Sequence, residues 1–112
     1  GPMIADSATY VETFKKQFDG QVPTYITAAG TAGALVLQLA IEKAGSLDPV
    51  KVREAMLALD TETFFGPVKF NEAGVDVKAS AVVAQVQGGK AVPVFPKAIA
   101  AAPVIYPRKP FQ

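Results

Sequence analysis

Apolar side chains recur every four residues near the start of the chain, at Tyr10, Phe14 and Phe18. Residues with this spacing share one face of an α-helix, so the pattern predicts an amphipathic helix packed on a core. Asp6-Ser7 supplies side chains suited to capping a helix N-terminus, and Gly20 is a residue type that often follows a helix end. We therefore expect a surface helix over about residues 7–18.

The next apolar stretch is more continuous. Tyr25-Ile26-Thr27 is rich in residues that favour strands and predicts a short strand. From about Thr31 to Ala44 the chain is apolar on nearly all sides, which predicts a helix that ends at Gly45. Such a helix needs cover on most of its surface. Either a partner surface outside this chain supplies it, or the helix is buried in its own domain.

A third helix has a local start signal. Asp48 is suited to cap it, and Pro49 is suited to its first position. Val52, Met56 and Leu59 fall on one helical face and predict its inner side. We expect this helix to end near Asp60, followed by a connection over residues 61–65.

The remainder alternates as strands do. Val68-Lys69-Phe70 predicts a short strand closed by a turn at residues 71–74, and residues 75–87 predict a longer strand. Gly88-Gly89 predicts a tight hairpin turn, and Ala91–Phe95 predicts the return strand, with Pro93 at an edge. The fold class is therefore α/β, with helices followed by a three-stranded meander. One face of the longer strand carries Ser80, Val82, Ala84 and Val86.

Composition excludes several classes of chemistry. The 112 residues are enough for one small domain. Eleven basic residues balance ten acidic ones, so charge gives no reason to expect a nucleic-acid partner or an anionic membrane. The chain has no Cys and no His, which removes a Cys nucleophile, a Ser-His triad and an ordinary zinc site. We expect no enzyme activity, no cofactor and no apolar run long enough to span a bilayer.

Acidic residues occur in two places without a catalytic or metal-binding spacing. Asp60 and Glu62 lie two residues apart, but we interpret them as a polar helix end and not as an acid–base pair. Asn71, Glu72 and Asp76 miss the spacing of a calcium-binding loop and are typical of a turn.

The candidate binding segment lies between the predicted strand and the apolar helix. Backbone N–H groups at a helix N-terminus favour an anion such as a carboxylate, and small side chains let a ligand approach the backbone. The segment lacks the Lys-Ser/Thr ending of a phosphate loop. A packing role, in which small residues only allow the helix to lie close to a sheet, is equally open. The candidate ligand-binding residues are Thr27, Ala28, Ala29, Gly30 and Thr31.

Several stretches, taken in order, resemble branched-chain amino acid and amide solute-binding proteins of the type I periplasmic family. Residues 10–18 are similar to a helix of that family with the pattern Y-x-x-x-F-x-x-x-F. Residues 40–49 and 52–56 resemble its paired helices, and residues 66–74 resemble its "fGpvxFdexG" turn. Residues 92–96 and 103–107 are similar to its closing strand and C-terminal arm.

The resemblance implies a protein of two α/β lobes around a cleft, of which this chain would be the C-terminal portion. It implies a periplasmic protein that delivers amino acid-like solutes to the permease of an ABC transporter, with the cleft-facing stretch at residues 27–32. Many members have Tyr-Asp where this chain has Thr31-Ala32, which leaves open a roomier pocket or a ligand contact made elsewhere. A cytoplasmic amide sensor of the same fold is an alternative.

The expected organisation has three parts. Residues 1–3 are interpreted as the remnant of a cleaved tag, residues 4–96 as a partial α/β domain, and residues 97–112, with three prolines, as an extended C-terminal arm. If the apolar helix has lost its cover, the isolated chain is expected to form a homo-oligomer without ligand activity of its own, with domain swapping as one route to it.

Overall fold

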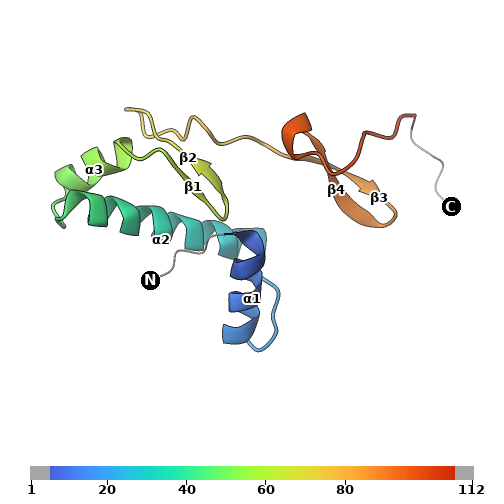
Figure 1. Ribbon diagram of the computed structural model, residues 1–112, viewed down its shortest axis with the longest axis horizontal. Coiled ribbons are helices and arrows are strands. Elements are labelled where there is room, and N and C mark those ends of the chain that lie inside the picture. Colours follow the sequence, from blue (N-terminus) through green and yellow to red (C-terminus); the bar gives the residue numbers. More distant parts are fainter. Residues whose placement is uncertain (1–5, 108–112) are drawn as a thin grey trace. The chain divides into compact units, whose positions relative to one another are not determined.

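The computed structural model describes residues 6–107, and these form two compact units that divide between Ala79 and Ser80. The first unit contains three helices and a short hairpin, and the second contains a longer hairpin and the C-terminal arm (Figure 1). The proposed tag remnant at residues 1–3 and the last five residues of the proposed arm lie outside the described part of the chain.

The first helix, α1, runs over Ser7–Gln17 and begins where its capping signal predicted. The Oδ1 atom of Asp6 accepts a hydrogen bond of 2.8 Å from the backbone N–H of Thr9. This bond and a second one from the Thr9 hydroxyl lower the pKa of Asp6, because they stabilise its charged form. Tyr10 is buried, Phe14 half-buried and Phe18 exposed, so the predicted stripe faces the core mainly at its N-terminal end.

The second helix, α2, spans Tyr25–Ala44, so the strand predicted at residues 25–27 is wrong. The reason is a reciprocal cap. Thr24 Oγ1 accepts from the N–H of Thr27 at 3.3 Å, and Thr27 Oγ1 accepts from the N–H of Thr24 at 2.9 Å. Two otherwise unpaired N–H groups are satisfied in this way, and this outweighs the strand preference of three residues. The helix ends as predicted at Gly45, whose backbone is in the left-handed conformation with a φ of 58°.

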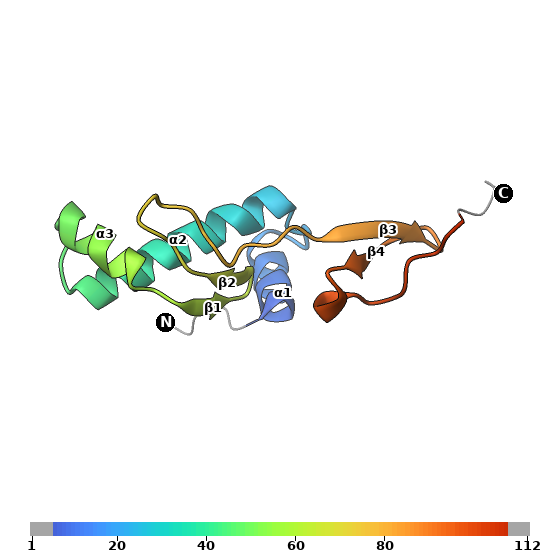
Figure 2. The same cartoon turned by 90° about the horizontal axis from the view of Figure 1, so that it is seen from above.

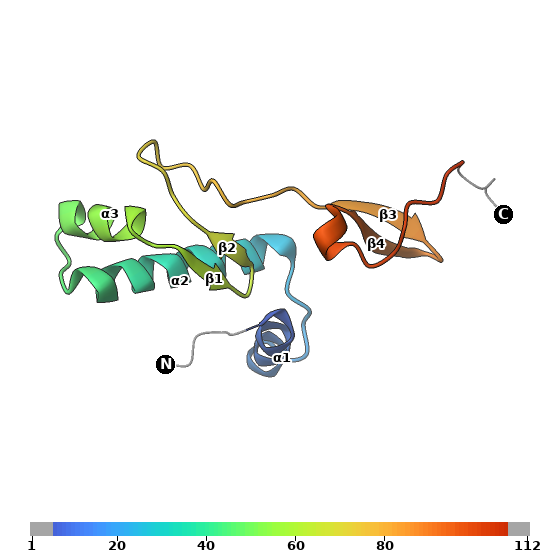
Figure 3. The ribbon, with the colours of Figure 1, turned by 45° about the horizontal axis from the view of Figure 1, so that its top comes forward.

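The third helix, α3, covers Pro49–Leu57 and confirms its predicted start. Asp48 Oδ1 accepts from the N–H groups of Val50 and Lys51 at 3.0 and 3.1 Å. Helix α3 lies along the C-terminal half of α2 (Figure 3). Its Val52 and Met56 pack against the cluster that contains the buried side chains of Val36 and Ala40.

Residues 61–65 do not form the simple connection that was predicted. Strand β1, Thr61–Thr63, pairs antiparallel with β2, Gly66–Val68, with Thr61 opposite Val68. The turn between them consists of Phe64 and Phe65, residue types that give no turn signal. Gly66 follows with a φ of 133°, a conformation that side-chain-bearing residues rarely adopt.

The predicted three-stranded meander is also wrong. Only β3, Val83–Gln87, and β4, Lys90–Phe95, form the second sheet, and residues 77–82 belong to no strand. The Asp76 carboxylate accepts from the N–H groups of Lys69 and Lys78, both at 3.0 Å. These bonds use N–H groups that a strand ladder would need. The turn at residues 71–74 is confirmed, as is the hairpin turn, where Gly88 and Gly89 have positive φ. A short 3₁₀ helix, η1, follows at Lys97–Ile99.

The first unit has two small clusters of buried side chains. In one, Tyr10 stacks on Phe64 with ring centroids 4.4 Å apart, and both pack with Ala32 of α2. The Ser7 hydroxyl donates to the carbonyl of Phe64 at 2.8 Å and fixes α1 to the same turn. The other cluster consists of Val36 and Ala40 of α2 and of Leu59, which lies between α3 and β1. Figure 2 shows the β1–β2 hairpin and α3 alongside α2.

Helix α2 is covered on one side only within the described residues. Its buried residues are Ala32, Val36 and Ala40, whereas Ile26 is 79% exposed and Leu37 is 47% exposed. The interpretation that this apolar helix is buried in the core of its own domain is therefore wrong for the described chain. An apolar face of this length remains open.

We expect Phe64→Ala to lower the free energy of unfolding by about 3 kcal/mol, because it removes the ring that joins α1 to α2. Phe65→Ala should cost less than about 1.5 kcal/mol, since this neighbouring ring is 41% exposed against 7% for Phe64. Urea unfolding of both variants measures the difference. Equal losses would contradict the proposed core.

Candidate functional site

The five predicted binding residues lie in the first two turns of α2. Thr27 and Gly30 are exposed, and Ala28, Ala29 and Thr31 are half-buried. The prediction that these residues lie on a turn between a strand and a helix is wrong, because the helix already begins at Tyr25. The segment therefore presents a helix surface in place of a loop.

The polar groups of this segment are partly used within the helix. Thr27 Oγ1 donates to the carbonyl of Thr24 at 2.9 Å, and Thr31 Oγ1 donates to the carbonyl of Thr27 at 3.0 Å. Both hydroxyl protons are therefore engaged. Thr27 Oγ1 already accepts from the N–H of Thr24, but each hydroxyl oxygen has two lone pairs and can accept one further hydrogen bond. By position, the N–H groups of Tyr25 and Ile26 are the ones in the first turn without a helical acceptor or a cap.

The small residues divide between a packing role and an open surface. Ala28 packs against the cluster of Tyr10, Ala32 and Phe64, and the Thr31 hydroxyl lies 3.4 Å from the Tyr10 hydroxyl. At Gly30, in contrast, an added Cβ would meet no atom within 4 Å. The packing interpretation thus holds for Ala28, while Gly30 lies on a face that another surface or a ligand can approach closely.

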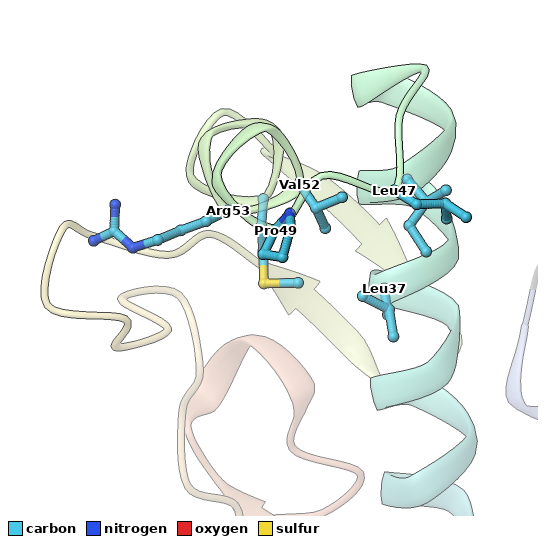
Figure 4. A pocket seen from close by; sticks show the side chains of 7 residues that line it. Leu37, Leu47, Pro49, Val52 and Arg53 are labelled. Carbon is cyan, nitrogen blue, oxygen red and sulfur yellow. The ribbon is translucent and has the colours of Figure 1, made fainter.

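A pocket that the sequence analysis did not identify lies between α2 and α3. It is an open apolar pocket of about 360 Å³ (Figure 4). Arg53 lies at its rim, but its Nη2 atom donates to the carbonyl of Glu72 at 3.0 Å, and its guanidinium points away from Leu37 and Leu47. The sequence signal for this pocket was the predicted inner side of α3, which includes Val52 and Met56. The lining residues are Leu37, Ile41, Leu47, Pro49, Val52, Arg53 and Met56.

The charged groups form a surface network and not a reaction centre. Asp60 pairs with Lys78 and, at 3.0 Å, with Lys69. The hydrogen bonds from Lys78 and then Lys69 lower the pKa of Asp60. Its near neighbour in sequence, Glu62, lies exposed on β1 and takes no part in these two ion pairs. Among residues 6–107, no group of three or more acidic side chains is placed to hold a metal ion.

Helix α2 is longer than the sequence analysis predicted. Its 20 residues contain a window of mean hydropathy 1.3, so by length and composition it could cross a bilayer. The expectation that no segment could do so was wrong, because it placed the helix start at Thr31. Core helices and signal sequences meet the same criteria, so this length alone assigns no membrane role.

Comparison with known protein families gives one match over most of the chain. A family model described as "Periplasmic binding protein" matches residues 4–91. The chain belongs to this periplasmic binding protein family. The match includes all three helices and the candidate segment at residues 27–31, and it extends through β3 into the start of β4.

Family membership confirms the coarse part of the sequence-based interpretation. The mixture of helices and strands is consistent with a portion of the α/β periplasmic binding protein fold, as predicted. Members of the family are in general solute binders and not enzymes. The family match does not test the five candidate residues individually.

The Asp60 network predicts a pH dependence of stability. Because the pKa of Asp60 is lower in the folded state, its contribution is present above the unfolded pKa and is lost as pH falls through the folded pKa. We expect the difference in urea midpoint between the wild type and Asp60→Asn to shrink as pH falls from about 6 to about 2. Glu62→Gln is the matched control. A difference that stays constant over this range would rule out the network as its source.

Proposed function

We propose that this chain is the C-terminal part of the substrate-binding component of an ABC transporter for amino acid-like or related small organic solutes. Membership of the periplasmic binding protein family supports solute binding. The order of motifs from Tyr10 to Pro107 supports the branched-chain amino acid and amide branch of that family. A periplasmic location and a membrane permease as partner are part of the same proposal.

The observation that carries the proposal is the open face of α2. The exposed residues of this face include Ile26, Gly30 and Leu37. On its other side, α2 is covered by α3 and the β1–β2 hairpin. A two-lobed protein supplies further chain to cover such a helix and to complete a cleft. The 112 residues alone are then expected to bind solute incompletely.

In this proposal the first turns of α2 form one wall of the solute cleft. A solute carboxylate would lie near the N–H groups of Tyr25 and Ile26, where the helix dipole favours negative charge. Thr27 and Thr31 would contribute hydroxyl oxygens as acceptors for an ammonium group. Gly30 would let the solute approach, with Ala28 and Ala29 beside it. Binding acts by shifting the population from open to closed lobes, without covalent chemistry.

The test uses the full-length protein to which this chain belongs, titrated calorimetrically with leucine, valine and short aliphatic amides. Gly30→Phe should weaken binding at least about tenfold, because the ring fills the space beside the candidate segment. Thr31→Val should weaken it about fivefold by removing one acceptor.

The matched control is Thr13→Val on the exposed side of α1, which should leave the affinity unchanged. Unchanged affinity for Gly30→Phe would remove the candidate segment from the site. Failure of the unaltered protein to bind any of these solutes would contradict the proposed substrate class.

Self-association of the isolated chain is a second candidate property, favoured by the exposure of 76% at Tyr25 and 79% at Ile26. Native mass spectrometry of the 112-residue chain should show a dimer or a larger species, because paired copies hide these side chains from water. Leu37→Lys on α2 should shift the population toward monomer, whereas Val50→Lys on α3 should not. A wild-type monomer with cooperative unfolding would contradict this prediction.

A further inference from the structure

The C-terminal arm returns across the second unit along one face of the β3–β4 hairpin. Side chains alternate along a strand, so Gln85 and Gln87 of β3 point to the same face, opposite to that of Val86. After η1 the chain turns back, and the N–H of Ala101 donates to the carbonyl of Pro93 at 2.8 Å. Figures 2 and 3 both show the arm running alongside the hairpin.

Two glutamine side chains hold the next residues of the arm. The Nε2 atom of Gln85 donates to the carbonyl of Ile105 at 3.0 Å, and its Oε1 atom accepts from the N–H of Ile105 at 2.9 Å. The Nε2 atom of Gln87 donates to the carbonyl of Pro103 at 2.9 Å and to Gln85 Oε1 at 2.8 Å. The bond between the two glutamines orients both amides.

The partners match in chemistry. Ile105 has both a backbone donor and a backbone acceptor, and the side-chain amide of Gln85 forms a hydrogen bond with each. Pro103 has only an acceptor, and Gln87 presents only a donor to it. These three hydrogen bonds from Gln85 and Gln87 all reach backbone atoms of the arm, and they set its register as a neighbouring strand would.

Apolar burial contributes little to holding the arm. Val104 is 59% exposed, Ile105 is 40% exposed and Tyr106 is 90% exposed. An attachment made of exposed hydrogen bonds, each of modest net stability, opens at a lower free energy than a buried core.

We propose that residues 101–105 form a strap that detaches from the β3–β4 hairpin as a local unit, and that the Gln85–Gln87 pair controls its opening. The hairpin remains folded when the strap opens, because its ladder and its Gly88-Gly89 turn do not use the arm. Opening uncovers the polar face of the hairpin that carries Gln85 and Gln87.

The experiment is native-state hydrogen exchange of the 112-residue chain by NMR, with each amide rate divided by its unfolded-chain rate. Gln85→Leu removes both bonds to Ile105 at similar size, and the Ile105 amide should exchange at least about fivefold faster. Gln87→Leu should speed the same amide by a smaller factor, because it removes only the bond to Pro103 and the bond that orients Gln85. The control Val86→Thr, on the opposite face of β3, should leave the Ile105 rate unchanged.

Amides of the β3–β4 ladder should keep their rates in both glutamine variants. An unchanged Ile105 rate in Gln85→Leu would show that the pair does not hold the strap. Equal acceleration of Ile105 and of the ladder amides would show that the arm and hairpin open together, and this would also overturn the proposal.

Discussion

The first unit depends on the contact among Tyr10, Ala32 and Phe64. The two rings stack at 4.4 Å, and both reach α2 only because the residue facing them there has a single methyl group. This contact brings together a helix, a hairpin turn and a second helix that are far apart in sequence. It also decides which side of α2 is covered, because the side that carries Ala32 faces α1 and the side with Ile26 and Gly30 does not.

The candidate site follows from this arrangement. Thr31 lies beside the Tyr10 hydroxyl, at the boundary between the covered and the open sides of α2. A surface of small residues next to a rigid aromatic contact is suited to receive either a solute or another part of a larger protein. We propose both uses together, with the open face shared between a solute cleft and the remainder of a lobe.

Features fixed by local chemistry could be predicted from the sequence, and features fixed by competition between local and tertiary bonds could not. The predicted helix caps at Asp6 and Asp48 are confirmed, as are the helix end at Gly45 and the turn at Gly88-Gly89. Each of these features is fixed by chemistry within a few residues. The strand at residues 25–27 failed because the Thr24 cap was not recognised. The meander failed because Asp76 bonds the N–H groups of Lys69 and Lys78. The pocket between α2 and α3 needed the packing of two helices, which spacing alone does not give.

We propose that the open face of α2 is covered in the complete solute-binding protein. The chain has no Cys, so a single thiol introduced as Leu37→Cys reports on this face alone. Its rate of reaction with a maleimide is measured in the 112-residue chain at low concentration and in the full-length protein, each relative to the same protein in urea. We expect fast labelling in the short chain and labelling at least about tenfold slower in the full-length protein. Equal rates in the two would contradict it.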